Sequence, residues 1–286
     1  MPYFDHDGVR IFYTDERKEG TGATALLLHG WSCDSHDWSF QIPCLLQHGF
    51  RVIALDHRGH GRSSAPISQT PAKTYGPRAM AEDAVALLQH LQTGPVLLIG
   101  HSMGSNVASI MAVEHAELVK ALVVMQPIYS ASPSAMQALA SSMRESPDRI
   151  PEVAVEFFDK VMYTSRTPDW IKTWTRRRVL GNAPEGVVSC LEGIVAVSDE
   201  FMGRGDRAKA FMQRRKGPRL AICGIPTAPA WEEALGLEAG RDEAHFVDGG
   251  TFVMLVEPEK VNRLLVDWLK KIDLLHPRQT EEPSRL

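Results

Sequence analysis

The stretch VLLIGHSMGSN, residues 96–106, contains the signal that decides the fold. It begins with a short apolar run and continues into a helical pattern over residues 104–116. Between them, the Gly-x-Ser-x-Gly sequence is typical of a sharp strand-to-helix turn that holds a serine hydroxyl at the edge of a parallel sheet. The turn also puts Ser102 at a helix N-terminus, where partial positive charge stabilises a developing anion. Ser102 is therefore the candidate nucleophile.

Short apolar runs recur along the chain, and helical patterns separate them. The runs cover residues 9–13, 24–28, 51–55, 121–125 and 219–223, and the other helical patterns cover 77–92 and 257–272. Continuous runs of this length, rich in β-branched residues, are typical of parallel strands buried on both faces. The alternation predicts an α/β protein with a doubly wound, mostly parallel sheet.

Residues from about 130 to 215 interrupt this alternation with a helical stretch. We therefore expect one α/β domain over residues 1–275 that carries a helical cap insertion, followed by a disordered tail at 276–286. The aromatic residues of the cap should partly form its own core and partly line a ligand site. The candidate substrate-binding residues are Gln126, Trp170 and Trp174, whereas the basic run Arg176–Arg178 is interpreted as a solvated helix face.

The composition, 44% hydrophobic and 23% charged, is ordinary for a soluble globular protein. A net charge of −4 argues against nucleic acid or an anionic membrane surface as partner. The four cysteines are widely spaced, which favours free thiols in a reducing compartment and no metal site. The N-terminus is too polar for a signal peptide. We expect a cytoplasmic protein with a small-molecule ligand and no cofactor. The sequence leaves its oligomeric state open between a monomer and a homodimer.

Two further motifs follow apolar runs: LLLHGWSCDSHDW at residues 26–38 and DHRGHGRSS at 56–64. Acyl transfer needs two backbone N–H groups directed at one oxygen. The expected donors of this oxyanion hole are Trp31, just after His-Gly, and Met103, just after the candidate nucleophile.

In this order and spacing, HGW, DHRGHGRSS and GHSMG resemble the α/β-hydrolase superfamily. The resemblance covers nearly the whole chain except the cap, and it implies an eight-stranded, mostly parallel sheet. It also implies that Asp56 and Arg58 are structural, that His29 shapes the oxyanion loop, and that His101 is a packing residue.

The resemblance further implies a histidine base seven residues before a proline that starts the last helix. Here Pro258 starts that helix, and Thr251 stands seven residues before it. A threonine cannot act as a base near neutral pH. The alternative alignment uses His245, in AHFV, and requires six extra residues before the helix. We favour Thr251 in the histidine slot and keep His245 as a tentative base.

The acid of a catalytic triad is missing as well. The resemblance places it shortly after one of two neighbouring strands. The first position, IPTAP at residues 225–229, contains no carboxylate, and the second is occupied by Gln126. Two nearby carboxylates remain as candidates, Glu243 and Asp248, although neither stands where the acid normally does.

The segment PTAPAW at residues 226–231 is similar to the cofactor-free dioxygenases of this fold that cleave 3-hydroxy-4-quinolone rings. Those enzymes keep a histidine base and an acid, so the two departures count against that activity.

Three hypotheses about function follow from these motifs and departures. The leading one is an enzyme that acts through Ser102 on a small, largely apolar ester, lactone or related carbonyl compound. The others are a ligand-binding pseudoenzyme and a non-hydrolytic enzyme, such as a lyase, isomerase or cofactor-free oxygenase.

Overall fold

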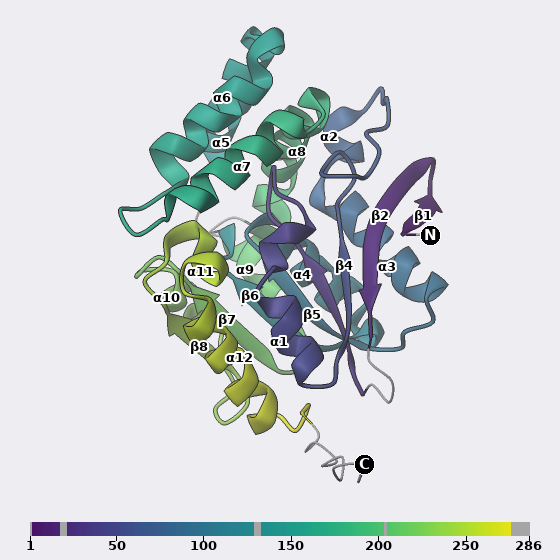
Figure 1. Cartoon of the computed structure of the whole chain (residues 1–286), viewed down its shortest axis with the longest axis vertical. Coiled ribbons are helices and arrows are strands. Elements are labelled where there is room, and N and C mark those ends of the chain that lie inside the picture. Colours follow the sequence, from purple (N-terminus) through teal and green to yellow (C-terminus); the bar gives the residue numbers. More distant parts are fainter. Residues whose placement is uncertain (1, 18–21, 129–132, 203–204, 276–286) are drawn as a thin grey trace, which may run out of the picture.

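The computed structural model describes residues 2–17, 22–128, 133–202 and 205–275, so the predicted tail lies outside the described residues. An eight-stranded sheet forms its centre, in the order β1-β2-β4-β3-β5-β6-β7-β8 (Figure 1). Only the pairings of β2 with β1 and β4 are antiparallel, which confirms the predicted mostly parallel sheet. The strands are β1 (Tyr3–His6), β2 (Val9–Glu16), β3 (Thr24–Leu28), β4 (Arg51–Leu55), β5 (Val96–His101), β6 (Val119–Met125), β7 (Arg219–Cys223) and β8 (Glu243–Phe246).

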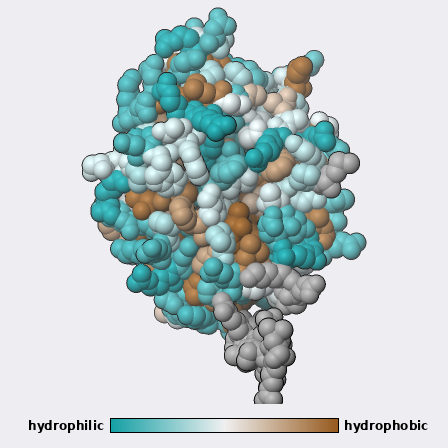
Figure 2. Space-filling view, in the orientation of Figure 1, coloured by the Kyte–Doolittle hydropathy of each residue, from teal (hydrophilic) through white to brown (hydrophobic). Residues whose placement is uncertain are grey.

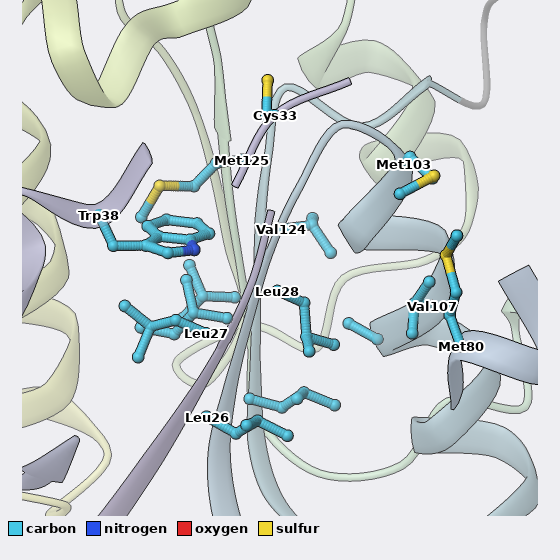
Figure 3. Packing of buried hydrophobic residues seen from close by; sticks show 14 of the residues in the cluster. Leu26, Leu27, Leu28, Cys33, Trp38, Met80, Met103, Val107, Val124 and Met125 are labelled. Carbon is cyan, nitrogen blue, oxygen red and sulfur yellow. The ribbon is translucent and has the colours of Figure 1, made fainter. Parts of the chain in front are cut away.

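The central strands are buried on both faces, as their continuous apolar sequences predict. Every residue of β3, β5 and β7 is buried. Alternate side chains therefore need a covering layer on each side of the sheet. Figure 3 shows this arrangement, with Trp38 and Met125 on one side of the strands and Val124 and Val107 on the other.

Helices supply the two covering layers. On one face α1 packs against α12, and on the other α3 packs against α4, which contacts β5 and β6 (Figure 1). Outside the segment between β6 and β7, the helices are α1 (Gln41–Gln47), α2 (Pro71–Thr74), α3 (Pro77–His90), α4 (Met103–Glu114), α10 (Pro229–Ala234), α11 (Val253–Val256) and α12 (Pro258–Lys271), with short 3-10 turns η1 (Ser35–Trp38), η2 (Ala116–Leu118) and η7 (Gly250–Phe252).

Between β6 and β7 the chain forms a group of helices that we name the helical insertion, residues 133–212. Figure 1 shows its first four α-helices gathered beyond one end of the strands. The insertion consists of α5 (Pro133–Glu145), η4 (Pro147–Arg149), α6 (Ile150–Phe157), the π-helical η5 (Phe158–Met162), α7 (Asp169–Gly181), α8 (Pro184–Val197), the π-helical η6 (Ser198–Met202) and α9 (Asp206–Met212).

The surface seen in Figure 2 is mostly hydrophilic, with apolar residues in small separate areas. Across the described ranges, no helix combines the length and the apolar character that spanning a bilayer requires. The same ranges contain no group of three or more His, Cys, Asp or Glu residues placed to hold a metal ion. The four cysteines are free thiols.

Three buried histidines pack together beneath the loop that follows β3. The ring of His29 lies 4.5 Å from that of His57 and 5.4 Å from that of His60, and its Nε2 accepts a hydrogen bond from the His57 backbone N–H. Burial lowers the pKa of His57 well below its usual value and the pKa of His60 to about 3. The folded protein therefore keeps both rings neutral at pH values where an unfolded chain would protonate them.

This cluster predicts acid sensitivity of the fold. Below pH about 6.5 the unfolded state takes up protons that the folded state excludes, so the free energy of unfolding should fall as the pH decreases, by up to ~1.4 kcal/mol per pH unit for each ring. Urea denaturation between pH 7 and 4.5 measures this slope. In His60→Asn the slope should be smaller by about one proton. An unchanged slope would show that His60 is protonated in the folded state.

Candidate active site

Ser102 lies on a strained turn between β5 and α4, with φ 50° and ψ −115°. Such a positive φ is unfavourable for a residue with a side chain, so the surroundings must hold it in place. A Cβ atom on Gly104 would collide with the carbonyl oxygen of Leu28, and one on Gly100 would collide with the Gly104 carbonyl. The two glycines are therefore required because the helix starts directly against its neighbouring strands.

The loop after β3 runs beside this turn. A Cβ atom on Gly30 would lie 3.2 Å from the Cβ of Ser102, so the backbone of the loop passes directly over the serine. The backbone N–H groups of Trp31 and Met103, the two expected oxyanion donors, have no hydrogen-bond acceptor among the described residues. The Trp31 ring is fixed separately, because its Nε1 donates a 2.9 Å hydrogen bond to the Val187 carbonyl of α8.

The Ser102 side chain has no base within reach in the described part of the chain. The residue is only 5% exposed, and its hydroxyl makes no hydrogen bond to any described group. The adjacent histidine, His101, is occupied on both sides, since its Nδ1 lies 3.0 Å from Asp37 Oδ2 and its Nε2 lies 2.8 Å from the Thr251 carbonyl oxygen. The ring therefore links the loop that carries Asp37 to the loop that carries Thr251, and neither nitrogen is left to take a proton from Ser102.

Asp37 continues this network into the helical insertion. Its Oδ1 accepts a 2.6 Å hydrogen bond from Arg178 Nη1 of α7, which also lies 3.2 Å from Asp34 Oδ1. Burial alone would raise the pKa of Asp37, but the Arg178 guanidinium and the hydrogen bond from His101 hold it well below its usual range. Asp37 is therefore a carboxylate at neutral pH, and its charge is balanced inside the protein.

Thr251 and Gln126, which the family resemblance aligns with the base and acid positions, both lie near the turn that carries Ser102. The hydrogen bond from His101 fixes Thr251 next to the turn that carries Ser102. Gln126 follows β6 directly, and its Oε1 accepts hydrogen bonds from the backbone N–H groups of Gly224 (2.7 Å) and Ile225 (3.1 Å). The Gly224 carbonyl in turn accepts from the N–H of Gly250, the neighbour of Thr251.

The other candidates for base and acid lie elsewhere. His245 is on the edge strand β8, in the same row of the sheet as His101 but three strands away, which corresponds to roughly 14 Å. Its Nε2 lies 2.7 Å from Glu243, which also pairs with Lys271. The Asp248 side chain is 63% exposed and faces Arg166. The structure therefore places His245 far from Ser102, and the side chains of Glu243 and Asp248 are paired with other residues.

Aromatic rings from the insertion and from the loop after β8 pack around the oxyanion loop, and we name this group the aromatic wall. The Trp31 ring lies 5.5 Å from Phe158 and 6.0 Å from Phe157. Phe252, which follows Thr251, lies 6.2 Å from Phe158 and 6.1 Å from Tyr163. Burial is the main cause that raises the pKa of Tyr163 to about 12, so the phenol is neutral. The members of the wall are Trp31, Phe157, Phe158, Tyr163 and Phe252.

Two expectations concern α7, and the structure contradicts the second. Trp170 and Trp174, expected to bind substrate, are 38% and 47% exposed, and they contact one another rather than the aromatic wall. The run Arg176–Arg178 is not uniformly solvated, because the Arg178 side chain points away from solvent and forms an ion pair with the buried Asp37. Helical spacing contains a signal for this, since Ile171, Thr175 and Val179 form the buried face and Arg178 stands beside it.

The ion pair of Arg178 predicts a large effect on stability. Arg178→Met leaves the buried Asp37 carboxylate without its cation, and breaking such a pair typically costs about 3 kcal/mol or more. Urea denaturation should show this loss. Arg176→Met, on the exposed side of the same helix, should change the free energy of unfolding by less than about 0.5 kcal/mol. Equal effects of the two substitutions would contradict the structural role of Arg178.

Comparison with known proteins places this site in a family. Residues 26–182, more than half of the chain, match the family described as alpha/beta hydrolase fold. The non-heme haloperoxidase of Rhodococcus erythropolis is 31% identical over 170 residues, which cover 58% of this chain and 56% of that protein. The (E)-2-((N-methylformamido)methylene)succinate hydrolase of Acinetobacter baylyi is 24% identical over 256 residues, which cover 88% of this chain and 92% of that protein. The chain spans about half the length of the haloperoxidase and of the Streptomyces lividans chloroperoxidase.

Solved structures show the same fold. The enol-lactonase from Burkholderia xenovorans LB400 superposes with a TM-score of 0.76 at 20% identity, covering 94% of this chain and 100% of that one. The esterase from Exiguobacterium antarcticum superposes with a TM-score of 0.74 at 22% identity, covering 92% and 97%. With the strained serine turn, the sheet order and the sequence match in agreement, this chain belongs to the α/β hydrolase fold family.

Proposed function

We propose that this chain is an α/β-hydrolase-type enzyme that acts on a small, largely apolar ester, lactone or related carbonyl compound. The observation that carries the proposal is a pair of backbone N–H groups beside a buried serine hydroxyl, none of which has a hydrogen-bond partner among the described residues. The carbonyl oxygen of the ligand would accept hydrogen bonds from Trp31 and Met103, and Ser102 Oγ would face the carbonyl carbon.

The surroundings of this site support the choice of an apolar carbonyl compound. The aromatic wall beside the oxyanion loop contains no charged group, so it favours apolar ligands over ionic ones. Structures of the same fold are named as an enol-lactonase and an esterase, whose substrates contain such a carbonyl group. The oxygen of a bound carbonyl group would accept the hydrogen bonds that the N–H groups of Trp31 and Met103 do not make within the described residues.

The proposed reaction is slow, because Ser102 has no base to remove its proton. A neutral hydroxyl is a poor nucleophile, and neither Thr251 nor Gln126 accepts a proton at neutral pH. The two backbone donors still stabilise an oxyanion, and each such donor contributes about 10²–10³-fold to the rate of acyl transfer in other enzymes. The site therefore polarises a carbonyl group without efficiently attacking it.

The occupation of the base and acid positions by Thr251 and Gln126 favours a second candidate, a binding protein that retains the pocket without turnover. The same arrangement is compatible with a lyase, isomerase or cofactor-free oxygenase, in which the two N–H groups stabilise an enolate and no acyl-serine forms. Labelling of Ser102 and hydrolysis of activated esters separate these candidates.

The central test restores the two missing groups. Gln126→Glu is nearly isosteric, and a carboxylate oxygen can keep both hydrogen bonds from Gly224 and Ile225. Combined with Thr251→His, it should raise the rate of fluorophosphonate labelling at Ser102 and of p-nitrophenyl acetate hydrolysis by at least tenfold, because general-base assistance is typically worth ~10²–10⁴-fold. Thr251→His alone should give a smaller gain, since nothing then orients the imidazole.

Thr251→Val together with Gln126→Glu serves as the matched control and should give no gain. Ser102→Ala should abolish the activity of the restored variant but change that of the unmodified chain only slightly. Rapid labelling of the unmodified chain that His245→Ala abolishes would overturn the proposal. If the unmodified chain binds an apolar ketone yet hydrolyses p-nitrophenyl acetate no faster than buffer alone, the binding-protein candidate holds instead.

A further inference from the structure

A cleft lies outside the Ser102 site, between the C-terminal half of α7 and the loops that follow β3 and β4. Its volume is about 630 Å³, which is within the range of small-molecule sites. Neither Ser102 nor a member of the aromatic wall lines it. The side chains that matter for its chemistry are Asp34, His36, Arg62, Trp174, Arg177 and Arg178.

The cleft carries an excess of positive charge. Three arginines and one histidine face a single carboxylate, Asp34, which is already engaged by Arg178 at 3.2 Å and by the His36 ring at 3.2 Å. The hydrogen bond to Asp34 raises the pKa of His36, which favours the charged ring. Arg62 and Arg177 form no ion pair with any described residue. Two guanidinium groups are therefore available to an anion.

An aromatic surface lies beside these cations. Trp174 is 47% exposed, and its ring is held edge to face against Trp170, with centroids 5.1 Å apart. The Arg62 guanidinium is held over the Phe12 ring, 4.7 Å from its centroid. An indole that is braced on one side and open on the other can stack against a flat ligand. The cleft thus combines a stacking surface with positive charge.

Hydrogen bonds across the base of the cleft tie its walls together. Asn182, at the end of α7, accepts a 3.0 Å hydrogen bond from the N–H of Gly61 and donates a 3.1 Å hydrogen bond to the carbonyl of Ser32. Arg178 adds the buried ion pair with Asp37. The backbone segments that carry the cleft side chains are therefore fixed relative to one another, which limits the backbone entropy lost on binding.

We propose that this cleft binds a planar aromatic carboxylate. The carboxylate would pair with Arg62 and Arg177, and the ring would stack on Trp174. A neutral aromatic molecule would lose the charge-assisted hydrogen bonds, and an aliphatic carboxylate would lose the stacking. The proposal does not depend on turnover at Ser102.

Isothermal titration calorimetry with 2-naphthoate tests this site in the full chain. We expect saturable binding that weakens with salt and is at least fivefold tighter than binding of 2-naphthamide. Arg62→Gln, Arg177→Gln and Trp174→Ala should each weaken 2-naphthoate binding by at least fivefold. Arg176→Gln removes the same charge from the neighbouring position of α7, outside the cleft lining, and should change binding by less than twofold.

Three outcomes would overturn the proposal: no saturable binding at millimolar 2-naphthoate, an equal effect of Arg176→Gln and Arg177→Gln, or binding that survives both cleft arginine substitutions. In the last case the ligand would occupy the aromatic wall. A crystal soaked with 2-naphthoate would then show the ligand beside Ser102 and not in the cleft.

Discussion

The buried imidazole of His101 connects the parts of the molecule on which the site depends. Through one ring nitrogen it holds Asp37 in the loop after β3, and through the other it holds the Thr251 carbonyl in the loop after β8. Asp37 extends the connection to Arg178 of the helical insertion. Because His101 directly precedes Ser102, all three segments are positioned relative to the serine. Hydrogen bonds between charged groups in a buried setting are strong only while every member is satisfied, so this network favours one arrangement of the loops.

Backbone strain accompanies this positioning. Ser32, Ser102 and Gln126 have positive φ values of 56°, 50° and 43°, and they lie in loops that follow β3, β5 and β6. Each such residue costs on the order of 1–3 kcal/mol and persists only where its surroundings over-determine it. They are three of the six non-glycine residues with positive φ in the described ranges, and they lie at strand ends, where an oxyanion site needs fixed N–H groups. The rest of the sheet, with its fully buried β3 and β5, supplies the rigidity that maintains this strain.

Much of this arrangement was predictable from the sequence, because it depends on local spacing. Continuous apolar runs revealed the strands, and the glycines around Ser102 revealed the turn. The seven-residue interval to Pro258 predicts Thr251 in the histidine slot, and the loop that carries it does lie beside Ser102. Contacts between distant segments were not predictable. Arg178 was interpreted as solvated because its partner Asp37 is more than a hundred residues away. Trp174 was assigned to the Ser102 site because an aromatic residue in the insertion does not reveal which way its helix face points.

The loop at Thr251 is anchored by its backbone carbonyl and not by its side chain. The hydroxyl of Thr251 makes no hydrogen bond to another described residue, so the fold places few demands on which amino acid stands there. Gain or loss of the base is consequently a change of chemistry with little accompanying change of stability. The amino acid at this position can therefore change while the contacts that hold the loop stay the same.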